Sequence, residues 1–253
     1  MKAQRNWITP EGKSFIDYEN MMNQPHLLVA GATGSGKSVV INGIITTALF
    51  ESPSQIQFIL IDPKRVELVD YRYLPHTAFY ASEPAEMVRG LQMAMNIIEM
   101  RYKQMQSAHV KKYQGAQLYV IIDELVDLMT TNKKQVMPLI QRIAQVGRAA
   151  GVHLICATQC PLAKVIPTEI KVNFDARVGL RTRSAQDSRN ILGFNGCEDL
   201  PRYGQAYYMN PDTGVKKIVV PMYDKGETWR LINHWMQQRP PKKKGFFDRL
   251  FGI

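Results

Sequence analysis

The sequence predicts one large α/β domain, a mainly parallel sheet with helices on both faces, followed by a small C-terminal hairpin and helix. Three observations predict this fold class. Short apolar runs alternate with longer segments of helical spacing, several of those runs are almost wholly apolar, and a glycine-rich loop joins the first run to the first helical segment. A chain of 253 residues, 45% hydrophobic and 21% charged, can bury one core of this size.

Strands and helices are expected to alternate through the first half of the chain. The elements expected there are strands at 26–30, 58–61 and 118–122 and helices at 38–50 and about 85–106. Apolar residues three to four positions apart predict both helices, and Pro84 stands near the start of the second. Segments 26–30 (HLLVA) and 118–122 (LYVII) are typical of strands buried on both faces.

The second half continues this alternation and ends in the hairpin and helix. The elements expected there are a helix at about 135–150 that ends at Gly151, strands at 152–157 and 174–180, a helix between Ser184 and Gly193, two short strands joined at 210–214, and a terminal helix carrying Trp229, Ile232 and Trp235. Ser184 with Asp187 is a helix-capping pattern, and Gly193 is a helix stop. The turn-forming residues of 210–214 predict the hairpin.

The composition bounds the compartment and the partners. No run of about 18 uncharged apolar residues occurs, and the first residues are polar, so we expect a cytoplasmic protein. Cys156, Cys160 and Cys197 form no CxxC pair and lie apart from the histidines, so free thiols and no structural metal are expected. The net charge of +10 favours a polyanionic partner, although a basic protein that binds only ATP or an acidic membrane would look the same.

The chain is expected to divide into one domain at 1–239 and a tail at 240–253. The tail (PPKKKGFFDRLFGI) is a break in composition, with three lysines before several apolar residues at helical spacing. That pattern suits a membrane surface or a groove on a partner protein, and a disordered solubilising tail is the alternative.

The strongest motif is the glycine-rich loop. Segment 31–38 (GATGSGKS) fits G-x-x-x-x-G-K-[ST] between a predicted strand and a predicted helix, where a phosphate-binding loop belongs; the alternative is a chance match in a loop. Lys37 is expected to reach the β and γ phosphates of ATP, and the Ser38 hydroxyl to coordinate Mg²⁺. The nucleotide-binding residues predicted here are Gly31, Ala32, Thr33, Gly34, Ser35, Gly36, Lys37, Ser38 and Val39.

Polar residues at the ends of two further strands complete the predicted catalytic site. Asp123 and Glu124 follow LYVII, so Asp123 is expected to hold the Mg²⁺ shell and Glu124 to polarise the attacking water. An exposed acidic pair at a strand end is the alternative. Gln159 ends the next strand and would sense the γ phosphate or the water, unless it only forms a turn. Asp62 and Lys64 face the same edge with roles left open.

The order of the motifs identifies a family. Segments PHLLVAGATGSGKS, FILIDPKRVEL, EMRYKQM, VIIDELVDLM, RIAQVGRAAGVHLICATQ and DSRNILG resemble, in this order, the motor domain of the FtsK/SpoIIIE family of DNA translocases. The resemblance covers about 24–226. It implies a RecA-like ATPase that uses ATP and Mg²⁺, forms a hexameric ring and pumps double-stranded DNA.

The resemblance also implies an arginine that acts between subunits. Arg148, in the segment GRAAGVH, is similar to the residue that reaches the neighbouring subunit's ATP in this family, and a surface arginine capping a helix is the alternative. Two positions depart from the family pattern, because Cys160 and Ala185 stand where the family has basic residues. The DNA contacts predicted instead are Lys164, Lys171, Arg181 and Arg183, each of which could equally be solvated surface charge.

The function predicted is therefore an ATP-driven DNA translocase subunit. Mobile-element transfer motors and phage packaging motors are small members of this kind, and the chain could also be an excised motor of a larger protein. The alternative is a protein-secretion ATPase of the type VII class. A single phosphate-binding loop counts against that alternative, because such chains usually carry several ATPase domains in series.

Overall fold

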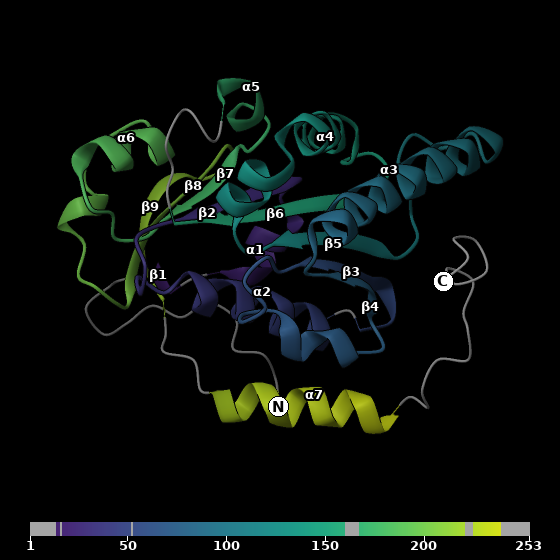
Figure 1. Cartoon of the computed structure of the whole chain (residues 1–253), viewed down its shortest axis with the longest axis horizontal. Helices are drawn as coiled ribbons and strands as arrows, with labels where there is room; N and C mark the ends of the chain where they lie inside the picture. The colour runs from purple at the N-terminus through teal and green to yellow at the C-terminus, as the bar shows by residue number, and fades with distance from the viewer. Residues whose placement is uncertain (1–13, 16, 52, 160–166, 221–224, 239–253) are drawn as a thin grey trace.

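The computed structural model describes residues 14–15, 17–51, 53–159, 167–220 and 225–238. Within these residues, nine strands form one sheet in the order β1-β9-β8-β7-β2-β6-β5-β3-β4 (Figure 1). The segment of the sheet from β7 through β4 is parallel, whereas β8 runs antiparallel to both β7 and β9. The predicted α/β class with a mainly parallel sheet is confirmed.

The strands expected from the sequence are present, with small differences at their ends. Their bounds are β1 Ser14–Phe15, β2 His26–Ala30, β3 Ile56–Ile61, β4 Thr77–Ala81, β5 Gln117–Ile122, β6 Val152–Thr158, β7 Ala176–Gly179, β8 Gln205–Asn210 and β9 Gly214–Val219. The sequence prediction missed β4, which pairs in parallel with β3 at the edge of the sheet. It also missed the two-residue β1, and it made β7 longer than it is.

Helices cover both faces of the sheet. Their bounds are α1 Tyr18–Asn23, α2 Lys37–Glu51, α3 Pro84–Ser107, α4 Leu125–Val146, α5 Thr168–Lys171, α6 Ala185–Leu192 and α7 Lys225–Gln238, with short 3₁₀ turns η1 Pro53–Gln55, η2 Val69–Tyr73 and η3 Cys197–Asp199. In Figure 1, α3 and α4 lie above the sheet and α2 and α7 lie below it. No helix among these combines the length and apolar character needed to cross a membrane.

The central strand β2 shows why the strands read as unbroken apolar runs. Leu27 and Val29 belong to the core cluster shared with α2, whereas Leu28 belongs to the cluster shared with α3 and α4. All three side chains are at most 1% exposed. Since successive side chains of a strand point to opposite faces, a strand covered on both sides must be apolar at every position.

The helix predicted at about 135–150 is wrong at both ends. Helix α4 begins at Leu125, directly after Glu124, and ends at Val146, where Gly147 takes the C-cap position. The first half was missed because six consecutive polar residues, TTNKKQ at 130–135, interrupt the apolar spacing. Asn132 has non-helical dihedral angles (φ −140°, ψ 38°) and marks a kink within that run. Residues 147–151 then form the turn into β6.

The capping and turn predictions for the C-terminal part are confirmed. The Ser184 hydroxyl accepts a hydrogen bond from the Asp187 amide at the start of α6, and Gly193 ends that helix with φ 88°. Strands β8 and β9 pair from Asn210↔Gly214 onward as the predicted hairpin, and α7 follows. The predicted tail at 240–253 lies outside the described residues.

Candidate ATP-hydrolysing site

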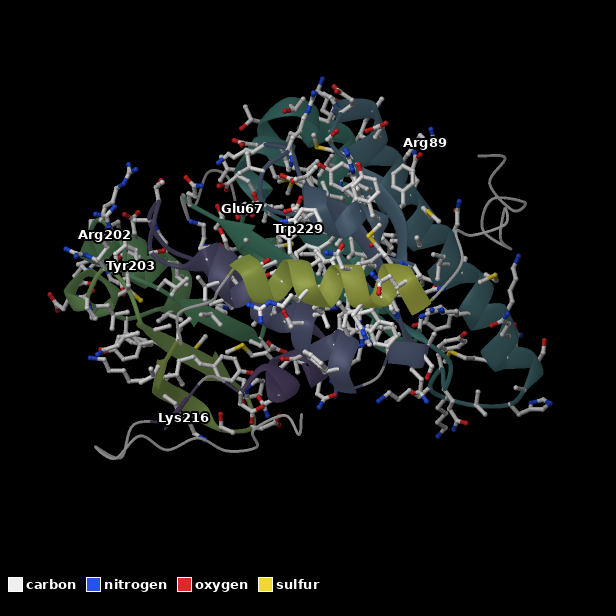
Figure 2. All side chains as sticks on the ribbon, turned by 90° about the horizontal axis from the view of Figure 1, so that it is seen from below. Glu67, Arg89, Arg202, Tyr203, Lys216 and Trp229 are labelled. Carbon is white, nitrogen blue, oxygen red and sulfur yellow. The ribbon has the colours of Figure 1, made fainter. Side chains whose placement is uncertain are left out.

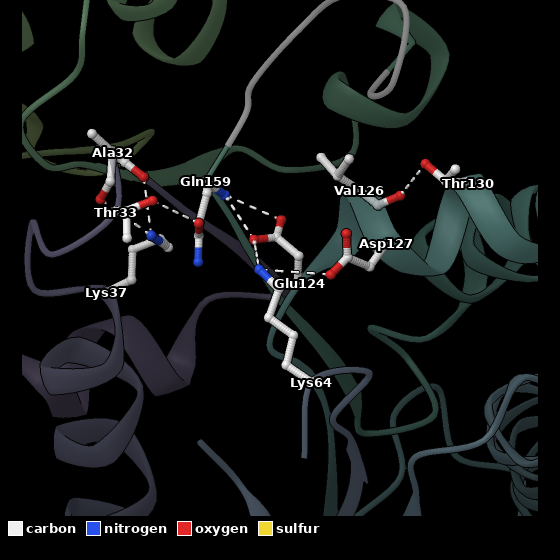
Figure 3. A network of polar contacts seen from close by, with 10 residues as sticks. Ala32, Thr33, Lys37, Lys64, Glu124, Val126, Asp127, Thr130 and Gln159 are labelled. Carbon is white, nitrogen blue, oxygen red and sulfur yellow. Dashed lines mark hydrogen bonds and ion pairs between the residues drawn. The ribbon is translucent and has the colours of Figure 1, made fainter. Parts of the chain in front are cut away.

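Four adjacent parallel strands end at one edge of the sheet. The pairing of Ala30 with Thr158 and of Ile122 with Cys156 brings the ends of β2, β6 and β5 together, and β3 follows with Ile61 beside Ile122. The residues that come next therefore share this edge. They are the phosphate-binding loop after β2, Gln159 after β6, Asp123 and Glu124 after β5, and Asp62 after β3. Figure 3 shows Thr33 of the loop, Gln159 and Glu124 side by side.

The loop between β2 and α2 has the backbone that its glycines allow. Gly34 and Gly36 have φ 73° and 104°, values that other residues adopt only with strain. Gly31 is needed for close packing, because a Cβ there would lie 2.6 Å from Ser35 Oγ and 2.7 Å from Leu180 Cβ. The loop thus folds as a phosphate-binding loop does, and it opens onto α2, which begins at Lys37.

The Lys37 side chain lies back across the loop. Its Nζ donates hydrogen bonds to the carbonyl oxygens of Gly31 at 3.0 Å and Ala32 at 3.3 Å. Burial lowers the pKa of Lys37, and the nearby carboxylates of Glu124 and Asp123 partly offset that effect. A buried ammonium held in this position is placed to meet the phosphates of a bound nucleotide.

Asp123 lies in a site crowded with negative charge. Burial, together with the neighbouring carboxylates Asp62, Glu67 and Glu124, raises its pKa to about 7. Such a site favours a cation, and Ser38, half-buried at the second position of α2, supplies a hydroxyl oxygen of the kind that Mg²⁺ accepts. No described group of three or more His, Cys, Asp or Glu residues is arranged to hold a metal alone. A Mg²⁺ ion here would therefore complete its shell with phosphate and water.

Glu124 is held in place from two sides. Its side chain is 3% exposed, and the Gln159 backbone N–H donates to both carboxylate oxygens at 3.1 and 3.2 Å. Lys64 Nζ lies 3.2 Å from Glu124 Oε2 and 3.6 Å from Asp127 Oδ2 (Figure 3). Burial alone would lower the pKa of Lys64, but Glu124 and then Asp127 raise it above its ordinary value.

Gln159 connects this glutamate to the phosphate-binding loop. Its side-chain Oε1 accepts a hydrogen bond from the Thr33 hydroxyl at 2.8 Å, while its backbone holds Glu124 (Figure 3). A change at the loop can therefore reach both the glutamate and the residues that follow β6. The sequence placed Gln159 at this edge but did not predict its contact with Thr33.

Two residues with roles left open by the sequence now have positions. Lys64 is the cation that pairs with Glu124. Asp62 is fully buried, and its Oδ2 accepts hydrogen bonds from the Leu68 amide at 3.0 Å and the Tyr80 hydroxyl at 3.4 Å. These contacts hold the segment between β3 and η2 against the catalytic edge. The sequence also missed Arg202, whose guanidinium lies beside Gly34, because no local pattern joins two segments so far apart in the chain.

Arg148 lies at the opposite edge of the sheet from the phosphate-binding loop. It is exposed, it follows α4, and its carbonyl accepts a hydrogen bond from Gly151 in the turn that enters β6. Since β6 contains seven residues, the turn and the catalytic edge are roughly 20 Å apart. The structure therefore does not bring Arg148 to the catalytic residues of its own subunit.

The predicted DNA contacts do not form one cluster. Arg181 and Arg183 are exposed after β7 at the edge of the phosphate-binding loop, where Ala32 N–H donates to the Arg181 carbonyl at 2.8 Å. Lys171 ends α5 before β7 begins, at the other edge, and its Nζ donates to the Asn190 carbonyl at 3.4 Å. Burial, followed by repulsion from Arg177, lowers the pKa of Lys171. Lys164 and Cys160 lie outside the described residues.

Comparison with known proteins identifies relatives of this site and fold. The model of the FtsK/SpoIIIE family matches residues 10–119 and 113–163. A curated relative, the DNA translocase FtsK of Rickettsia typhi, is 33% identical over an alignment 274 positions long, which covers 91% of this chain and 37% of that protein. The chain thus spans about a third of the length of the curated relatives it matches.

Solved structures show the same fold. The conjugation coupling protein TcpA of pCW3, solved as a monomer with ATPγS, superposes with a TM-score of 0.75 at 25% identity and covers 87% of this chain and 66% of its own. The type VII secretion ATPase EccC of Thermomonospora curvata superposes with a TM-score of 0.76 at 22% identity, over 92% of this chain and 30% of its own. The predicted RecA-like fold is confirmed.

Proposed function

We propose that this chain, which belongs to the FtsK/SpoIIIE family, is a motor subunit that hydrolyses ATP to move double-stranded DNA. One observation carries the proposal. The phosphate-binding loop, Asp123 and Glu124 meet at one sheet edge, and Gln159 hydrogen-bonds to both the loop and Glu124. An ATPase needs the first three, and a motor also needs a connection such as Gln159 that transmits hydrolysis to another part of the chain.

Each catalytic residue has a proposed task. Lys37 neutralises charge on the β and γ phosphates, and Glu124 orients the attacking water and takes its proton. Ser38 and Asp123 would hold Mg²⁺, which supplies charge neutralisation of the phosphates when it is bound. The Gln159 backbone N–H and Lys64 Nζ hold the Glu124 carboxylate in one orientation, because both donate to its oxygens.

The cargo is proposed to be duplex DNA, held through its phosphates. Lys164 and Lys171, in the segment 161–171 that follows Gln159 in the sequence, are the first proposed contact with its backbone. Arg181 and Arg183 lie at the nucleotide edge and are the second proposed contact. Contacts of this kind do not depend on base sequence and weaken steeply with salt.

Assembly into a homo-oligomeric ring, with six subunits as in the family pattern, is also proposed. Its support is the position of Arg148, exposed and roughly 20 Å from the catalytic edge of its own subunit. An arginine there can assist hydrolysis only in a neighbouring subunit. The proposed setting is the cytoplasm, where ATP and DNA meet, and any membrane contact would come from the tail at 240–253.

The experiment that tests this function measures ATPase rate against linear duplex DNA over a salt series. A DNA motor should be stimulated by duplex of any sequence, and half-maximal stimulation should need more DNA as the salt concentration rises. A Lys171→Ala/Arg181→Ala variant should need more DNA than the parent for half-maximal stimulation at every salt concentration. An ATPase rate that does not change with DNA at any salt concentration would reject the proposal that DNA is the cargo. The fold shared with EccC would then make a protein cargo the hypothesis to test.

A further inference from the structure

We infer that Arg202 and Tyr203 form the binding surface for the adenosine half of the nucleotide, acting within the same subunit. The inference rests on the proposed binding of ATP to the phosphate-binding loop. It concerns the end of the nucleotide that the catalytic residues do not reach.

The order of the strands determines where that end must lie. The catalytic residues follow β6, β5 and β3, all on one side of β2. The terminal phosphate must therefore lie on that side of the phosphate-binding loop. Because the nucleotide is elongated, its ribose and base extend toward the other side, where the segment after β7 and the segment before the antiparallel β8 lie at this edge.

Residues 201–204, between η3 and β8, bring an arginine to the phosphate-binding loop on that side. A Cβ built on Gly34 would lie 3.4 Å from Arg202 Nη2 and 3.9 Å from Nε, so the guanidinium rests against the loop itself. Gly34 leaves room for the guanidinium because it has no side chain. Its φ of 73° is a second reason for a glycine at this position. Arg202 thus lies against the loop whose backbone is shaped to bind phosphate.

The Arg202 guanidinium keeps its hydrogen-bonding capacity for a ligand. Among the described residues its guanidinium makes no hydrogen bond or ion pair, and its one recorded partner is the Tyr203 ring, whose centroid lies 5.2 Å from Arg202 Cζ. Figure 2 shows the two side chains next to one another. An unpaired guanidinium beside a phosphate-binding loop can bind a phosphate oxygen or the ribose hydroxyls of the nucleotide.

Tyr203 supplies the apolar surface that a base requires. Its side chain is 60% exposed, so the ring is accessible to a ligand. An aromatic face of this kind stacks on a purine ring, and stacking tolerates any base because every base has a π face. The pair therefore fits an adenosine moiety, with Arg202 toward its phosphate end and Tyr203 toward its base.

The test compares ligands that contain or lack the adenosine moiety. Dissociation constants are measured by calorimetry for ATP, ADP and inorganic tripolyphosphate, each with Mg²⁺, on the parent chain, Tyr203→Ala, Tyr203→Phe and Arg202→Ala. Arg189→Ala is the matched control, since Arg189 is an exposed arginine on the neighbouring α6 that hydrogen-bonds to Asn195. Thermal melts of every variant check that the fold is kept.

The expected pattern separates the two residues. Tyr203→Ala should lower the affinity for ATP and ADP about 10-fold and leave the affinity for tripolyphosphate unchanged. Tyr203→Phe should bind all three ligands as the parent does. Arg202→Ala should lower the affinity for ATP and ADP by a similar factor, and Arg189→Ala should lower neither affinity.

Three results would overturn the inference. They are parent-like ATP affinity in both alanine variants, equal loss of tripolyphosphate and ATP in Tyr203→Ala, and a defect in Arg202→Ala confined to turnover at high protein concentration. The last would assign Arg202 to a neighbouring subunit. Failure of the parent chain to bind either ATP or tripolyphosphate would instead reject the proposed function, so the two failures are distinguishable.

Discussion

Replacing Glu124 by glutamine should remove the general base while leaving its surroundings nearly intact. Glu124 Oε2 accepts hydrogen bonds from both the Gln159 amide and Lys64 Nζ, at 3.2 Å each. A glutamine carbonyl oxygen can take this position and keep both bonds. The amide group then replaces Oε1 and loses one of the two bonds from Gln159, but no partner is left without an acceptor.

The size of the effect follows from this geometry. A positioned general base contributes about 10²–10⁴-fold to rate, equivalent to roughly 3–5 kcal/mol of transition-state stabilisation. The folded protein should lose only about 1 kcal/mol, because one hydrogen bond is weakened and the ion pair with a 38% exposed lysine is worth little. ATP affinity should change less than about threefold, since Glu124 acts on water.

The assay measures single-turnover hydrolysis and, separately, ATP binding on Glu124→Gln. Asp127→Asn is the matched control, because Asp127 is the other carboxylate near Lys64 but is 43% exposed and lies farther from its Nζ. It should keep the rate within about threefold of the parent. Hydrolysis by Glu124→Gln within tenfold of the parent, with ATP binding unchanged, would refute the assignment of the base.

Four further predictions test other parts of the structure. Lys37→Ala should abolish tight ATP binding in equilibrium dialysis, because it removes the ammonium that faces the phosphates. Arg148→Ala mixed with Lys37→Ala should recover part of the ATPase activity that each lacks alone, and a mixture shown to co-assemble without recovery would make Arg148 structural. Burial raises the pKa of Asp123 to about 7, so the folded state binds its proton more tightly than the unfolded state does; the resulting stability is present below pH about 4 and is lost as the pH rises through about 7. Asp123→Asn should therefore stabilise the nucleotide-free protein at pH 8, by up to about 4 kcal/mol in the free energy of unfolding, and should leave its stability unchanged at pH 4. Equal increases in Tm at both pH values would show that the raised pKa of Asp123 is not the cause. Arg101→Met should lower stability by about 2–4 kcal/mol in denaturant melts, since the buried guanidinium donates to the carbonyls of Ala150, Gly151 and Ala116, and a parent-like melt would contradict those contacts.

The positions of the candidate site residues could be predicted from the sequence for a physical reason. In a parallel sheet the residues after each strand meet at one edge, so an apolar run followed by a polar residue already indicates the site. That reasoning located the phosphate-binding loop, Asp123, Glu124 and Gln159, and the structure brings them together. Capping residues such as Ser184 and Gly193 were predictable because their contacts are local.

Contacts between distant segments were not predictable in this way. Nothing near Lys64 in the sequence shows that it pairs with Glu124, and nothing near Arg202 shows that it rests on Gly34. The first half of α4 was missed because the consecutive polar residues 130–135 interrupt the apolar spacing, and strand β4 because TAFYA is only partly buried. Positions set by tertiary packing leave little trace in the local pattern.

Movement along duplex DNA is the most direct measure of the proposed translocase function. A third-strand oligonucleotide is annealed to linear duplex DNA, and its displacement is followed with ATP, with ATPγS and with the Glu124→Gln variant. We expect displacement by the parent protein with ATP only, at a rate independent of the duplex sequence between the entry end and the third strand. Rapid ATP hydrolysis with the third strand left in place, under conditions where the protein binds the duplex, would contradict it.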